Sequence, residues 1–229
     1  MDIDRVSYVR KRLAESQQDE FPKYTNCLGL DIEVHKGVFW DDDNNVTGRW
    51  VTENVPSTTG KRVLEIGCGC GLTALFLAKN GASHVLATDV NPNAVTNTLA
   101  NARRNGLTNV TSIRSDLYES VDQNERFDYI VSHLPSTRVP EDFEYSSMIE
   151  YSSFDPGGTL LQKFLLESEK YLATNGTMIL GYNVSRNECM IMNKLAHLDL
   201  RYRLIAKRKI TPDGMINVHV YEIWPHHGE

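Results

Sequence analysis

The residues best suited to chemistry lie in a short glycine-rich segment. Gly67, Gly69 and Gly71 alternate with two cysteines, directly after an apolar run that ends at Glu65 and Ile66. Glycine permits a tight turn and lets a ligand lie directly against the backbone. The dinucleotide fingerprint G-x-G-x-x-G would place a glycine at position 72, where this sequence has leucine. The segment therefore predicts a ligand-binding loop of another kind.

Three acidic residues follow successive predicted strands. Glu65, Asp89 and Asp116 come at the ends of the first, second and third strands, which meet at one edge of a parallel sheet. A carboxylate beside the first glycine suits an amine, Asp89 can bind ribose hydroxyls, and Asp116 can accept a hydrogen bond from an adenine amino group. Each acid could instead cap the helix or turn that follows it. Taken together, they predict a positively charged nucleoside without phosphate, namely S-adenosylmethionine (SAM).

The same segments resemble the class I SAM-dependent methyltransferases over about residues 30–224. Residues 63–82 (VLEIGCGCGLTALFLAKNGA) are similar to the first motif, 87–95 (ATDVNPNAV) to the second, 115–118 (SDLY) to the adenine-side motif and 127–135 (FDYIVSHLP) to the fourth. The resemblance implies that the glycines contact the methionine part and that Asn91 and Leu117 flank the base. The predicted cofactor-binding residues are Thr47, Glu65, Gly67, Cys68, Gly69, Gly71, Asp89, Val90, Asn91, Ser115, Asp116, Leu117 and Ser132.

Two further segments, 37–51 (GVFWDDDNNVTGRWV) and 155–165 (DPGGTLLQKFL), are similar to release-factor glutamine and rRNA guanine-N2 methyltransferases. In that branch a threonine-containing loop lies over the cofactor, so Thr47 is a candidate contact, although it could also begin a helix as its N-cap. These relatives carry Asn-Pro-Pro-Tyr after the fourth strand, whereas this sequence has His133-Leu134-Pro135-Ser136. Histidine in place of the asparagine, and the loss of the aromatic residue at Ser136, both argue against methylation of an amide or nucleobase nitrogen.

His133 is the predicted catalytic residue. Histidine titrates near pH 6.5, so a neutral imidazole at this position could remove a proton before methyl transfer. The alternative is a structural histidine bonded to a loop carbonyl. The long segment 135–158 and the aromatic residues near the N-terminus indicate a substrate site, or else packing beneath the loop. The predicted substrate-binding residues are Phe39, Trp40, Leu134, Tyr151 and Asp155.

The spacing of apolar residues predicts an α/β protein with a Rossmann-like seven-stranded sheet, mostly parallel, with a C-terminal antiparallel hairpin and helices on both faces. Residues 1–55 are expected to form an N-terminal cap with a helix and a short hairpin, and residues 56–229 the SAM-binding domain. Predicted strands are 62–66, 84–88, 110–114, 127–132, 177–182, 202–210 and 216–224, and predicted helices are 72–79, 92–105, 160–172 and 187–197.

Composition limits the function classes. The chain has 229 residues, 41% of them apolar, with 24 Lys and Arg against 30 Asp and Glu and a net charge of −6. This charge argues against nucleic acid as a partner, and the basic residues in 201–209 are more typical of a protected sheet edge. No secretory signal, membrane span or metal-ligand cluster is predicted. Four cysteines without a pairing pattern indicate free thiols in the cytoplasm.

We therefore expect a cytoplasmic SAM-dependent methyltransferase that acts on a small-molecule substrate, by N-, C- or O-methylation, for example in natural-product biosynthesis. Three alternatives remain open. The first is a protein or RNA N-methyltransferase. The second is an enzyme that uses SAM for other chemistry, such as cyclisation that releases methylthioadenosine. The third is a non-catalytic SAM-binding partner subunit. The sequence carries no signal for an oligomeric state.

Overall fold

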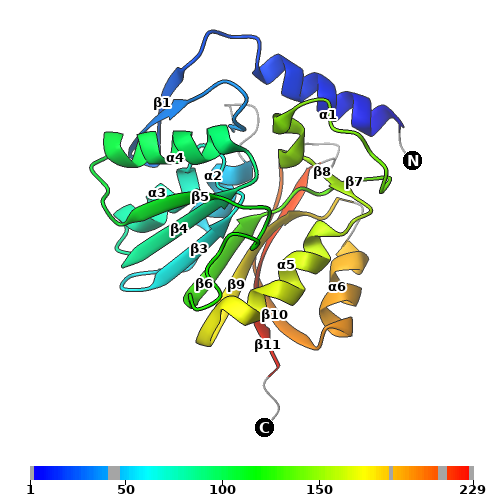
Figure 1. The fold of residues 1–229 in the computed structure, drawn as a ribbon. Helices are drawn as coiled ribbons and strands as arrows, with labels where there is room; N and C mark the ends of the chain where they lie inside the picture. Colours follow the sequence, from blue (N-terminus) through cyan, green and yellow to red (C-terminus); the bar gives the residue numbers. More distant parts are fainter. Residues whose placement is uncertain (1–2, 41–46, 186–187, 211–215, 227–229) are drawn as a thin grey trace.

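A seven-stranded sheet forms the centre of the computed structural model, which describes residues 3–40, 47–185, 188–210 and 216–226 (Figure 1). Its order is β10-β11-β9-β6-β3-β4-β5, and β11 runs antiparallel to both of its neighbours while the other pairs are parallel. This confirms the predicted Rossmann-like sheet. The strands are β3 (Arg62–Ile66), β4 (His84–Asp89), β5 (Val110–Arg114), β6 (Phe127–His133), β9 (Leu172–Asn183), β10 (Leu200–Lys209) and β11 (Asn217–Pro225).

Helices cover both faces of this sheet, because successive side chains of a strand point to opposite sides. In β3, Val63 packs on one side with α2 (Thr47–Glu53), α3 (Leu72–Lys79) and α4 (Pro92–Arg104). Its neighbour Leu64 packs on the other side with α5 (Leu160–Ser168) and α6 (Glu188–His197). The two apolar cores therefore lie on opposite faces of one sheet. No helix in the described part of the chain is long and apolar enough to cross a membrane.

The N-terminal segment forms the expected helix, α1 (Ile3–Ser16), and a hairpin of β1 (Lys23–Cys27) and β2 (Leu30–Val34). The hairpin starts at residue 23, and Leu28 and Gly29 adopt positive φ and make its turn. A third apolar cluster joins β2 to α3 and α4. The separation of residues 1–55 from the rest stays a prediction.

An additional small element lies beyond β6. Two three-residue strands, β7 (Thr137–Val139) and β8 (Phe154–Pro156), pair in parallel, and the 3-10 helix η1 (Met148–Ser152) lies between them in the chain. Helix α1 contacts both β7 and η1, and Figure 1 shows it lying along this element. Another 3-10 helix, η2 (Glu169–Tyr171), joins α5 to β9. The element at β7 and β8 orders the long segment that was predicted to border the substrate site.

Candidate active site

A cavity of about 500 Å³ opens at the C-terminal ends of β3, β4 and β6. Parallel α/β sheets commonly bind their ligands at this edge. Most of the residues predicted from the sequence line it. They are Phe39, Trp40, Thr47, Glu65, Gly67, Cys68, Gly69, Asp89, Val90, Asn91, Ser115, Asp116, Leu117, Ser132, His133, Leu134 and Tyr151.

Two glycines of the loop after β3 differ in the space around them: Gly67 borders free space, whereas Gly71 is tightly packed. Gly67 has a φ of +79°, and a Cβ placed on it would meet nothing within 4 Å, so its backbone borders free space. Gly71 has a φ of +91°, and its Cβ would lie 2.5 Å from Cδ1 of Leu75 and 2.9 Å from Thr98. Gly71 therefore packs against α3 and α4 and is not part of the cavity wall, contrary to its predicted contact with the cofactor.

The acids around this loop suit the nucleoside of SAM. One Asp89 carboxylate oxygen accepts from the Gly69 amide and the other from the Asn91 amide, both at 2.9 Å. Each oxygen keeps a second lone pair that can accept a ribose hydroxyl. Burial raises the pKa of Asp89, and Asp116 lines the cavity as an exposed residue. The bare backbone at Gly67 and these acids together fit SAM.

Two predicted contacts combine a cavity position with a structural role. Asn91 is the N-cap of α4, as expected, because its side-chain oxygen accepts from the Asn93 amide at 3.0 Å. Thr47 is the first described residue of α2 and is buried. Cys68 contacts the hydroxyl of Thr98 at 3.3 Å, and burial raises the pKa of its thiol. The Cys68 thiol is therefore protonated at neutral pH and is not a nucleophile.

Glu65 is a buried residue of β3 whose carboxylate lies at the start of α3 and borders the cavity. Its carboxylate accepts a hydrogen bond from the Ala74 amide at 2.9 Å and another from the Thr73 hydroxyl. Burial raises the pKa of Glu65 to about 8, so the carboxyl group is mostly uncharged at neutral pH. An ammonium group bound in the cavity would favour the charged form.

Binding of S-adenosylhomocysteine (SAH) should therefore release a proton from Glu65. At pH 7 we expect the release of about one proton per SAH bound, because a group with a pKa near 8 starts protonated and ends ionised beside the ligand's amino group. Affinity should accordingly rise between pH 6 and pH 8. Calorimetry in buffers of different ionisation enthalpy measures the release. Glu65→Gln is the control and should release none; an unchanged release in that variant would assign the proton elsewhere.

His133 ends β6 and lines the cavity as a half-buried residue. Burial lowers its pKa to about 4, so the imidazole is neutral at physiological pH. No side chain or backbone carbonyl in the described ranges forms a hydrogen bond with the ring, so the bonded structural histidine considered above is not what the structure contains. The ordinary histidine pKa near 6.5 is thus lowered at this position, because burial disfavours the charged ring.

An aromatic wall comes from the segment around η1. Tyr145 stacks on Tyr151 with ring centroids 3.8 Å apart, and its hydroxyl donates to the Phe154 carbonyl at 3.3 Å. Burial raises the pKa of Tyr145 to about 12. Asp155, predicted to bind substrate, is instead buried beside α5 and accepts from the Leu160 amide at 3.0 Å. Asp155 therefore binds the first backbone amide of α5 and does not line the cavity.

Several lining residues were absent from the predicted set. They come from elements that lie far apart in the sequence and meet here only through the order of strands and helices. No local spacing marks them, although Tyr145 lies within the long segment 135–158 that was expected to border the substrate site. The additional residues include Thr73, Tyr145, Ile149, Lys163, Asn183 and Val218.

This sheet, glycine loop and acid arrangement define a class I SAM-dependent methyltransferase. The chain belongs to the methyltransferase small domain family, whose profile matches residues 29–208. A Methanocaldococcus jannaschii protein named "Putative protein N5-glutamine methyltransferase" is 27% identical over 198 residues, which are 85% of this chain and 97% of that protein. The Vibrio parahaemolyticus ribosomal RNA small subunit methyltransferase C is 27% identical over 82% of this chain, but this match spans only 54% of the relative.

A solved structure shares the fold. It is the T. thermophilus 16S rRNA N2 G1207 methyltransferase in complex with AdoMet and guanosine, with a TM-score of 0.65 and 19% identity over 89% of this chain and 50% of that one. The chain is thus an enzyme that uses SAM, which confirms the predicted family, activity and cofactor. A non-catalytic partner subunit is not supported.

The expected small-molecule substrate was wrong. The relatives carry names that specify protein and ribosomal RNA substrates, and the same finding contradicts the expectation that nucleic acid is an improbable partner. Net charge was a poor guide because it averages over the whole surface. All five cations on β10 are exposed, in a chain whose net charge is negative.

Proposed function

We propose that this enzyme transfers a methyl group from SAM to a side-chain nitrogen of a protein. The observation that carries the proposal is the match to the N5-glutamine methyltransferase, which extends over 97% of that relative and 85% of this chain. The shared region therefore includes the segments that border the substrate side of the cavity as well as the cofactor loop. The neutral lining near His133 and the Tyr145–Tyr151 stack also suit an uncharged amide or amine.

The residues of the chain would act chiefly by positioning. SAM supplies a methyl group on a positively charged sulfur. Asp89 and the open backbone at Gly67 would bind the cofactor, and the Tyr145–Tyr151 stack would border the acceptor. The neutral ring of His133 can accept a hydrogen bond from the acceptor N–H, which holds the nitrogen lone pair toward the methyl group. Correct orientation of two reactants accounts for much of the rate in such a displacement.

RNA methylation is the second candidate, and one surface favours it. Strand β10 carries Arg201, Arg203, Lys207, Arg208 and Lys209. Its last residue, Lys209, pairs with Asn217 on β11, and the next residue of β11, Val218, pairs with Asn183 on β9. Asn183 and Val218 line the cavity. The C-terminal end of this basic strand therefore lies at the same edge of the sheet as the active site, where phosphates could bind.

Methyl-labelled SAM can separate the two candidates. The enzyme would be incubated with tritiated SAM and a mixture of ribosomes and soluble cell protein, and the precipitated label would be digested with protease or with ribonuclease. We expect protease alone to release the label, and excess SAH to abolish labelling as the control. Label released only by ribonuclease would reject the protein substrate in favour of RNA. Label confined to the acid-soluble fraction would contradict both.

We also propose that the enzyme works in the cytoplasm. The described cysteines Cys27, Cys68 and Cys70 are buried and form no disulfide with one another, which is typical of a reducing compartment. The side chain of Cys189 lies outside the described part of the chain.

A further inference from the structure

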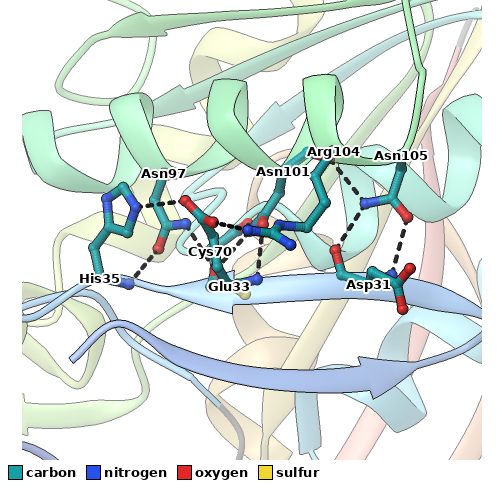
Figure 2. Close-up of polar contacts among 8 residues, drawn as sticks. All are labelled: Asp31, Glu33, His35, Cys70, Asn97, Asn101, Arg104 and Asn105. Carbon is teal, nitrogen blue, oxygen red and sulfur yellow. Dashed lines mark hydrogen bonds and ion pairs between the residues drawn. The ribbon is translucent and has the colours of Figure 1, made fainter. Parts of the chain in front are cut away.

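Three asparagines, two in helix α4 and one at its C-cap, bind the backbone of β2 and of the residue that follows it (Figure 2). Asn97, Asn101 and Asn105 are spaced four residues apart and so lie on one face of the helix. Their side-chain oxygens accept from the amides of His35, Glu33 and Asp31, respectively, at 2.8–2.9 Å. Their side-chain nitrogens donate back to the β2 carbonyls of Asp31 and Glu33. We call this set the asparagine ladder.

Asn101 differs from the other two members because it also contacts the cofactor loop. Its Nδ2 donates to the Cys70 carbonyl at 2.9 Å and to the Glu33 carbonyl at 2.8 Å. A carboxamide has two N–H groups, so both are used, and the residue is completely buried. Thr98, one turn earlier, donates to the carbonyl of Gly69 at 3.3 Å. One side chain therefore joins the hairpin directly to the glycine loop.

The hairpin in turn leads to the cavity wall. The chain runs from β2 through Gly37 to Phe39 and Trp40, which both line the cavity. The Gly37 carbonyl accepts from Asn91 at 2.8 Å, and its amide donates to Gln17 at 2.7 Å. The Phe39 carbonyl lies only 3.3 Å from the place where a Cβ on Gly69 would be. The segment that carries Phe39 and Trp40 thus rests against the glycine loop.

From these contacts we infer that Asn101 is a positioning residue for SAM: it fixes the separation of the glycine loop from residues 37–40, which form two walls of one cavity. If that separation changes, SAM can contact the glycine loop or residues 37–40 but not both together. The inference concerns the cofactor side of the cavity and does not depend on whether the acceptor is protein or RNA.

A matched pair of variants tests this role. Asn101→Asp and Asn97→Asp each retain the acceptor oxygen and the shape of the side chain, and each removes N–H donors at a fully buried site on the same helix face. Only Asn101→Asp loses the bond to Cys70. Calorimetry with SAH should show about tenfold or more weaker binding for Asn101→Asp than for Asn97→Asp, as expected for one lost buried hydrogen bond to the loop.

Steady-state kinetics give a readout that a purely structural role would not change. For Asn101→Asp, the KM for SAM should rise by a similar factor, while kcat at saturating SAM stays within about threefold of the Asn97→Asp value. Equal SAH affinity in the two variants would overturn the inference. So would a fall in kcat without a change in KM.

Serine variants remove the risk that a buried charge prevents folding. Asn101→Ser and Asn97→Ser shorten both side chains equally and add no charge. The same difference in SAH affinity is expected between them. If neither variant at position 101 folds while both variants at position 97 do, Asn101 serves stability alone and the inference is wrong.

Discussion

Replacing Gly71 with alanine should lower the free energy of unfolding by about 2–5 kcal/mol. The left-handed backbone costs a residue with a Cβ about 1–2 kcal/mol. Forcing a methyl group into a filled space adds about 1–3 kcal/mol. The new Cβ would lie 2.5 Å from Cδ1 of Leu75 and 2.9 Å from both γ atoms of Thr98, which are themselves buried. Urea denaturation followed by circular dichroism measures the change.

Two other glycines provide the controls. Gly106 has a φ of +65° and open space around its Cβ position, so Gly106→Ala should lose only the backbone contribution of about 1–2 kcal/mol. Gly67→Ala should cost a similar amount of stability. Its methyl group would occupy the ligand space, however, so SAH affinity should fall by about tenfold or more. Equal destabilisation by Gly71→Ala and Gly106→Ala would contradict the prediction, because it would show that the side chains around Gly71 move aside at no cost in stability.

Activity should be independent of pH between about pH 6 and pH 9 as far as His133 is concerned. Burial lowers the pKa of this ring to about 4, so it is neutral throughout that range. Below about pH 5 the ring begins to gain a proton, loses its acceptor lone pair and can no longer hold the acceptor N–H. The enzyme's kcat should therefore fall only at acidic pH, measured with saturating SAM and substrate.

Removal of the His133 side chain should lower kcat strongly. We expect His133→Ala to lower kcat by about 10²-fold, the scale of a misplaced reactant, with little change in SAH affinity. His133→Asn is the matched variant, because asparagine keeps a hydrogen-bond acceptor and cannot titrate; it should recover most of the activity. A wild-type kcat that rises through pH 6.5, and a flat profile in His133→Asn, would instead identify His133 as a general base.

The core of the fold and much of the cofactor site could be predicted from the sequence because their signals are local. The apolar run 62–66, the glycines after it and the helical pattern 72–79 agree with β3 and α3 as the structure has them. Asn91 before Pro92 marks the start of α4 in the same way. Because these strand boundaries were predicted correctly, the acids near the strand ends were placed correctly too, and Glu65 and Asp89 line the cavity as expected.

Elements that depend on distant pairing could not be predicted as well. The predicted helix 160–172 ends at Ser168, followed by η2, because Leu172 is extended and pairs with Phe127 on β6. This pairing also starts β9 at residue 172, whereas the predicted strand began at 177. Strands of three residues such as β7 and β8 have no periodicity to detect. Asp155 was predicted to bind substrate because it carries a carboxylate in the long loop. In the structure, its position just before α5 decides what it does, because the carboxylate accepts from the first amide of that helix.

The asparagine ladder has a consequence for self-association. A strand at the rim of a sheet exposes backbone donors and acceptors that can recruit a strand from another molecule, which is a common start of aggregation. In β2, the backbone groups on the side away from β1 are already bonded to the side-chain amides of Asn97, Asn101 and Asn105. These side chains thereby cover the edge of β2 without an extra strand. A variant that loses the asparagine ladder would leave the β2 backbone donors and acceptors unpaired, so another chain could pair with this edge beside the cofactor cavity.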